Sequence, residues 1–195
     1  MDRVFNEGIK FENQRFQDTS LETGEYENCI FTNCNFTNSD LSDSNFLCCE
    51  FRECNLSLAK LTNTSFRETK FMNCKLLGLH FEDCNNLMVS FEFDGCVLDL
   101  SSFNKLKLKK TSFKNSKIIE VDFTETDLSD SFFINCDLQR TIFKITNLER
   151  VDFCTSYNYS IDPELNRIKK AKFSLPGIAG LLDKYDIEIE QLEQE

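Results

Sequence analysis

A phenylalanine recurs at intervals of twenty residues along almost the whole chain, and a large apolar residue recurs every five. Neither the 3.6-residue period of an α-helix nor the two-residue period of a flat strand produces this spacing. A coil that turns a corner every five residues, with four sides to each turn, does produce it. Internal repeats of this kind outweigh local signals, so they define the architecture. The series runs through Phe11, Phe31, Phe51, Phe71 and Phe91, and then through Phe93, Phe113, Phe133, Phe153 and Phe173.

Each five-residue repeat has two positions that should face inward. The residue two places before the large apolar residue is small or medium in size, as at Cys34, Ser39 and Ala59. Residues two apart in an extended chain point to the same side, so this residue and the large one share the interior. The other three positions should face water. We therefore predict an all-β coil in which each inward residue lies above a similar residue of the preceding layer.

The repeat resembles that of the pentapeptide-repeat family, whose consensus is Ala, then Asp or Asn, then Leu or Phe, then two variable residues. Segments such as Cys34-Asn35-Phe36 and Ser39-Asp40-Leu41 carry the likeness, which extends over about residues 9–173. The resemblance implies a right-handed quadrilateral β-helix. We expect it to occupy residues 1–173 as one domain, followed by a separate tail.

The register of the repeat changes once. Asn86 alone interrupts the apolar series between Phe11 and Phe91, and later columns align only if two extra residues are present near 86–93. We therefore expect a two-residue bulge in one side of the coil at this segment.

Ten cysteines raise the alternatives of core thiols, disulfides or zinc. Eight of them lie two places before a large apolar residue, where a free thiol acts as a small apolar side chain. Their spacings of five and twenty are not typical of zinc ligands. We favour reduced core thiols, and we expect only Cys48 and Cys154 to face solvent.

Charge and composition argue against catalysis. The formal net charge is −11, and His80, beside Glu82, is the only histidine. A lone exposed histidine supports neither a catalytic triad nor a multi-histidine metal site, and no glycine-rich phosphate loop is present. We expect no enzyme activity, no cofactor and no metal. An acidic rod should repel nucleic acid and attract basic protein partners.

The chain begins with no apolar leader and contains no run of eighteen apolar residues. These observations favour a cytoplasmic protein that neither enters nor spans a membrane.

The five-residue pattern ends after the last repeats, near Phe173. Ser174-Leu175-Pro176 is typical of a helix start, and Ile178, Leu181, Leu182 and Tyr185 would share one face of a short C-terminal α-helix. Ile187 and Ile189 alternate with glutamates, as in a short strand. We predict that residues 174–195 cap the end of the rod or join two rods, with Ile187 adding to the contact.

This ending resembles that of the bacterial quinolone-resistance pentapeptide proteins. The resemblance implies a homodimer joined tail to tail, a surface that mimics duplex DNA, and a type II topoisomerase, DNA gyrase or topoisomerase IV, as the partner. The chain departs from that group in lacking long loops and in carrying a lysine cluster between Lys105 and Lys117. The alternative is a scaffold for an unknown protein partner. The candidate partner-binding acids are Asp18, Glu22, Glu25, Glu27, Asp40 and Asp43.

Overall fold

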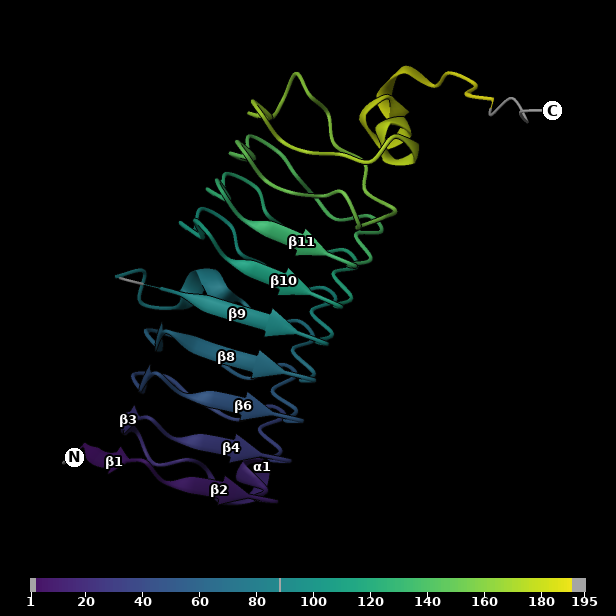
Figure 1. The fold of residues 1–195 in the computed structure, drawn as a ribbon. Helices are drawn as coiled ribbons and strands as arrows, with labels where there is room; N and C mark the ends of the chain where they lie inside the picture. Colours follow the sequence, from purple (N-terminus) through teal and green to yellow (C-terminus); the bar gives the residue numbers. More distant parts are fainter. Residues whose placement is uncertain (1–2, 88, 191–195) are drawn as a thin grey trace.

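The computed structural model describes residues 3–87 and 89–190. It is a parallel β-solenoid in which coil stacks on coil from the N-terminal to the C-terminal end, with a short helical tail beyond the last coil (Figure 1). The predicted fold class is confirmed. No helix within 3–87 or 89–190 has the length and apolar character needed to cross a membrane.

The regular elements are short because each side of the coil is only five residues long. One sheet is formed by β1, β3, β5 and β7, and another by β2, β4, β6, β8, β9, β10 and β11. In chain order the elements are β1 Val4–Glu7, β2 Lys10–Glu12, α1 Phe16–Thr19, β3 Gly24–Glu27, β4 Ile30–Thr32, β5 Asn45–Leu47, β6 Glu50–Arg52, β7 Ser65–Arg67, β8 Thr69–Met72, the 3₁₀ helix η1 Phe81–Asp83, β9 Phe91–Asp94, β10 Ser112–Lys114, β11 Phe132–Ile134, and the 3₁₀ helices η2 Pro176–Leu181 and η3 Asp183–Tyr185.

Four faces surround the core, and we number them in chain order by their inward residues. In one coil, Tyr26 lies on face 1, Phe31 on face 2, Phe36 on face 3 and Leu41 on face 4, and all four are buried. The corners between faces are turned by residues with positive φ, which recur every five residues and are often asparagine. Asparagine tolerates this left-handed backbone better than most residues.

All strand pairs are parallel, and most join residues twenty apart, as Phe31 and Phe51 do. The exception is β8 with β9, where Phe71 pairs with Phe93, twenty-two residues later. The two additional residues lie between Asn85, whose N–H still donates to Thr64 one coil earlier, and Phe91.

A continuous stack of phenylalanine rings fills face 2. Successive rings from Phe11 to Phe173 lie 4.7–5.4 Å apart, centroid to centroid, and are nearly parallel. The rings between the two ends are fully buried. Phe11 and Phe173 are only partly buried because each lies near an end of the rod.

Phe91 fills the core at the point where the repeat is interrupted by Asn86. Asn86, which should follow Phe66 in the face 1 column, is exposed. The ring of Phe91 is buried instead, 5.8 Å from the ring of Phe66 and 5.2 Å from that of Phe81. A phenylalanine at a position that usually holds a small residue thus occupies the space that Asn86 leaves.

The tail is helical but differs from the predicted α-helix. Residues 176–185 form two short 3₁₀ helices, η2 and η3, and residues 187–190 form no strand. Gly177 and Gly180 disfavour an α-helix, and both approach Tyr159 closely. An added Cβ would lie 1.9 Å from the Tyr159 hydroxyl at Gly177 and 2.0 Å from its carbonyl oxygen at Gly180. The tail therefore packs against the last coils through its two glycines and Leu181 rather than through one apolar α-helical face.

Removing a ring from the face 2 stack should destabilise the whole rod. Phe71 is 1% exposed, and its ring lies 5.1 Å from that of Phe51 and 5.4 Å from that of Phe93. We expect Phe71→Ala to lower the free energy of unfolding by about 3–5 kcal/mol, because it leaves a cavity between rigid layers. Chemical denaturation checks this, and a loss below about 1 kcal/mol would contradict the stacking.

The cysteines should divide into two classes of reactivity. Eight are buried, and Cys48 and Cys154 are exposed, as predicted. Partial burial and nearby carboxylates raise the pKa of both exposed thiols. Under native conditions we expect a bulky maleimide to label Cys48 and Cys154 alone, and to do so faster as the pH rises from 7 to 9, since the thiolate is the nucleophile. Mass spectrometry that finds Cys54 or Cys74 labelled at a similar rate would refute the assignment.

Candidate protein-interaction surface

The predicted acids gather mainly on two neighbouring faces at the N-terminal end. Glu25 and Glu27 point outward from β3 on face 1. Glu22 and Asp40 flank inward residues of face 4, and Asp43 occupies the corner between faces 4 and 1. Asp18 lies apart, in the single turn α1, which begins at Phe16 of face 3.

Their partners separate these acids into two groups. Asp18 pairs with Arg15 at 2.9 Å, and Asp40 pairs with Lys60 at 3.2 Å. Within the described part of the chain, Glu22, Glu25 and Glu27 form no ion pair. A hydrogen bond from Ser42, assisted by Lys60, lowers the pKa of Asp40. Asp43 accepts a hydrogen bond from the Asn63 side chain at 2.7 Å. The carboxylates with the most freedom to meet a cationic partner are thus the three glutamates.

The structure adds Glu7 to this group. It lies on β1 directly beside Glu27, because the two residues pair in the parallel register. Its position twenty residues before Glu27 is the sequence signal that could have identified it. We call Glu7, Glu22, Glu25 and Glu27 the N-terminal acidic surface.

The lysine cluster does not form one patch. Lys107, Lys109 and Lys110 lie on or beside face 1, whereas Lys114 points outward from β10 on face 2. Lys117 precedes Ile118 on face 3. Lys105 and Lys109 reach Glu125 and Asp127, one coil later, at 4.0 and 3.3 Å.

Charge is divided along the rod. Residues 1–104 hold 17 acids and 8 bases, whereas residues 105–173 hold 10 acids and 13 bases. The N-terminal half is therefore strongly acidic, and the remaining coils are weakly basic. Of these two parts of the rod, the N-terminal half alone has the surplus negative charge expected of a DNA-like surface.

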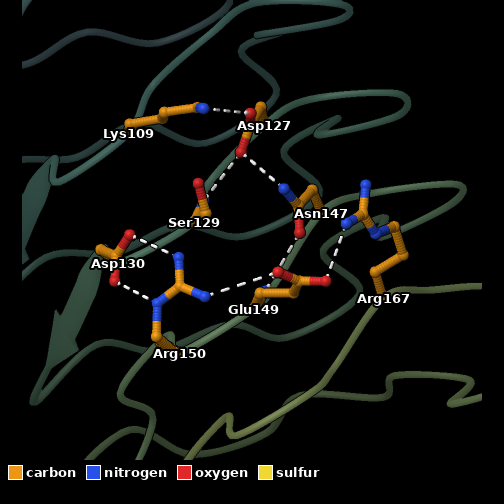
Figure 2. A network of polar contacts seen from close by, with 8 residues as sticks. All are labelled: Lys109, Asp127, Ser129, Asp130, Asn147, Glu149, Arg150 and Arg167. Carbon is orange, nitrogen blue, oxygen red and sulfur yellow. Dashed lines mark hydrogen bonds and ion pairs between the residues drawn. The ribbon is translucent and has the colours of Figure 1, made fainter.

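A connected polar network covers the C-terminal part of face 1 (Figure 2). Arg150 donates two hydrogen bonds to Asp130, at 2.5 and 2.8 Å, and lies 3.5 Å from Glu149. Arg167 binds the same Glu149 at 2.8 Å. Asn147 links the network to Asp127 at 2.9 Å.

The network keeps its carboxylates ionised. Hydrogen bonding from Arg150 lowers the pKa of Asp130, and hydrogen bonding from Arg167 lowers that of Glu149. Partial burial acts to raise the pKa of Asp127, but hydrogen bonds from Ser129 and Lys109 outweigh it and the pKa is lowered. These acids are held by their own coils, so they contribute little to attracting a partner.

The predicted dimer residues do not share one face. Ile178, Tyr185 and Ile187 are exposed, whereas Leu182 is partly buried and Leu181 packs against the core of the rod. In a 3₁₀ helix residues three apart align, so Leu182 falls on a different side from Ile178 and Leu181. His80 is exposed and lies 3.1 Å from Glu82, as predicted. Among the described residues, no three metal-binding side chains come together.

Comparisons with known proteins agree with this architecture. The family model for a pentapeptide repeat region matches residues 24–92 and 86–157. Two trypsin-treated variants of QnrB1, a plasmid-mediated fluoroquinolone resistance protein, are similar in structure. The first has a TM-score of 0.63 at 18% sequence identity and covers 96% of this chain and 100% of that one. The second has a TM-score of 0.53 at 18% identity and covers 98% and 96%.

No curated protein sequence matches the chain. At 18% identity, the likeness to QnrB1 concerns the fold. The family matches, by contrast, cover more than half of the chain and include the repeats that build the four columns. This chain belongs to the pentapeptide-repeat family.

Proposed function

We propose that this protein is a non-catalytic, DNA-mimicking rod that binds a type II topoisomerase through its acidic N-terminal half. The observation that carries the proposal is the N-terminal acidic surface, where Glu22, Glu25 and Glu27 are free of ion pairs among the described residues. The structural likeness to QnrB1, described as a fluoroquinolone resistance protein, supports the choice of partner.

A carboxylate surface on a stiff rod can replace DNA phosphates only where the partner presents a basic groove. Complementary charges speed the encounter and fix its orientation, and dissolved salt screens them. Binding should therefore weaken as salt rises, and DNA should compete with the protein for the same groove.

The second candidate is a scaffold for a different protein partner. The basic surplus of residues 105–173 favours it, because a DNA-like surface would be acidic along its whole length. The two candidates differ in whether gyrase responds to the protein at all.

A gyrase assay distinguishes them. We expect the protein to alter DNA supercoiling by gyrase and to change its inhibition by a fluoroquinolone, and the triple variant Glu22→Lys, Glu25→Lys, Glu27→Lys to lose most of this effect. The matched control, Glu12→Lys, Glu53→Lys, Glu92→Lys, makes the same change in net charge without touching the N-terminal acidic surface, and should retain the effect. If wild type leaves gyrase unaffected, the topoisomerase proposal is wrong. If both triple variants act like wild type, binding uses another surface.

We also propose that two chains join through the tail. Ile178 is 41% exposed at η2, and Leu175, just before it, is 84% exposed, which leaves apolar area for a symmetric contact. Light scattering should report twice the chain mass, and both Leu175→Glu and Ile178→Glu should give monomers. Leu58→Glu is the control, since Leu58 is also apolar and is 56% exposed but lies at a corner of face 3. A monomeric wild type at micromolar concentration would rule the contact out.

A further inference from the structure

The corner between faces 4 and 1 carries an apolar patch in the last coils. Ile142, Ile145 and Leu165 are 47, 62 and 54% exposed. Leu165 follows Ile145 in the stack, because the Thr146 N–H donates to the side chain of Asn166 at 2.9 Å and Asn147 pairs with Arg167. We call these three residues the corner patch.

The backbone at Ile145 makes the patch more unusual. Its φ is +57°, in the left-handed region that disfavours a β-branched side chain. Most other such corners hold polar or charged residues. An isoleucine here gains neither a relaxed backbone nor burial within the rod. A contact from outside the coil would supply the missing burial.

Cations lie on face 1 next to the corner patch: Lys169 follows the inward Ile168, and Lys170 turns the next corner, between faces 1 and 2. Arg167 is engaged by Glu149, but within the described part of the chain Lys169 and Lys170 form no ion pair. The nearby acids Asp130 and Glu149 already bind Arg150 and Arg167. An occupant of this corner should therefore bring both apolar side chains and carboxylates.

The tail brings such a segment to the edge of the patch. Lys184 binds Asp162 and Glu164, each at 2.7 Å, and the Tyr185 hydroxyl lies 3.0 Å from Glu164, the neighbour of Leu165. The next five residues, Asp186–Glu190, alternate acids with Ile187 and Ile189, and both isoleucines are 54% exposed.

We propose that Asp186–Glu190 folds back along this corner of its own rod as an extended strap. Side chains alternate in an extended segment, so a strap running parallel to the rod axis can place its isoleucines on Ile145 and Leu165 and its carboxylates toward Lys169 and Lys170. Five extended residues span about 17 Å, and two coil spacings span about 10 Å, so the strap can cover both layers of the patch.

The docked strap buries the corner patch and offsets the positive charge of the last coils. It uses Ile187 within one chain, while Ile178 on η2 stays available for a tail-to-tail contact. The proposal of a docked strap can therefore be tested independently of the proposed dimer and of topoisomerase binding.

Cross-linking tests the strap directly. In a background of Cys48→Ser and Cys154→Ser, which removes the two exposed thiols, Leu165→Cys and Ile187→Cys are combined and oxidised with copper–phenanthroline. A disulfide requires Cα atoms within about 7 Å. We expect an intramolecular bond that forms about tenfold faster than in the control pair Leu100→Cys with Ile187→Cys, because docking raises the effective concentration of the two thiols. Leu100 is exposed to a similar extent, 56% against 54% for Leu165, but its corner adjoins face 3.

Equal rates for the two pairs would overturn the proposal, since they would indicate a tail with no preferred site. Disulfide-linked dimers would overturn it as well, because the segment would then lie on a second copy. Adding Lys169→Glu and Lys170→Glu, or about 0.5 M salt, should slow formation of the first bond several-fold by removing or screening the attraction. A rate unchanged by both would contradict the assigned role of the lysines.

Discussion

Each coil of this rod depends on the coil beneath it, because neither its backbone nor its large inward side chains are satisfied alone. Parallel hydrogen bonds join residues twenty apart, and they form only while the inward residue of each face lies above a similar one. The stacked rings from Phe11 to Phe173 meet this requirement through nearly the whole molecule. Stability in such a structure is a sum of contacts between neighbouring layers, so a defect in one layer must be repaired locally.

The same constraint places all recognition chemistry outside. In the described coils, stacked rings and thiols fill the interior, and about three of every five residues face outward. What distinguishes one end of the rod from the other is therefore charge, acidic over residues 1–104 and weakly basic over residues 105–173. A partner would recognise the position of charges on a given face and at a given coil, and the net charge alone does not describe these positions.

The repeat was sufficient to predict the four columns, the buried thiols and the exposure of Cys48 and Cys154, because each depends only on position within five residues. It could not predict that Phe91 would fill the space left by Asn86. Phe91 precedes a face 2 residue, and only three-dimensional packing shows that its ring occupies the gap in the face 1 column. The 3₁₀ tail was missed because close approach of Gly177 and Gly180 to Tyr159 outweighed the helical pattern of its apolar residues. The pairing of Asp40 with Lys60 was missed, although the twenty-residue period of the repeat carried the signal for it. The roles of the six predicted acids and of the tail in partner binding and dimerisation stay predictions.

Hydrogen–deuterium exchange, followed residue by residue, tests the layer-by-layer account most directly. Amides that donate to a neighbouring coil on either side of the insertion, such as those of Asn55 and Asp122, should exchange slowly and with similar protection. The amides of Leu87 and Val89, which donate no hydrogen bond to another coil among the described residues, should exchange much faster. Rapid exchange throughout one side of the insertion would contradict the account, because it would show that the stack does not continue across the change of register.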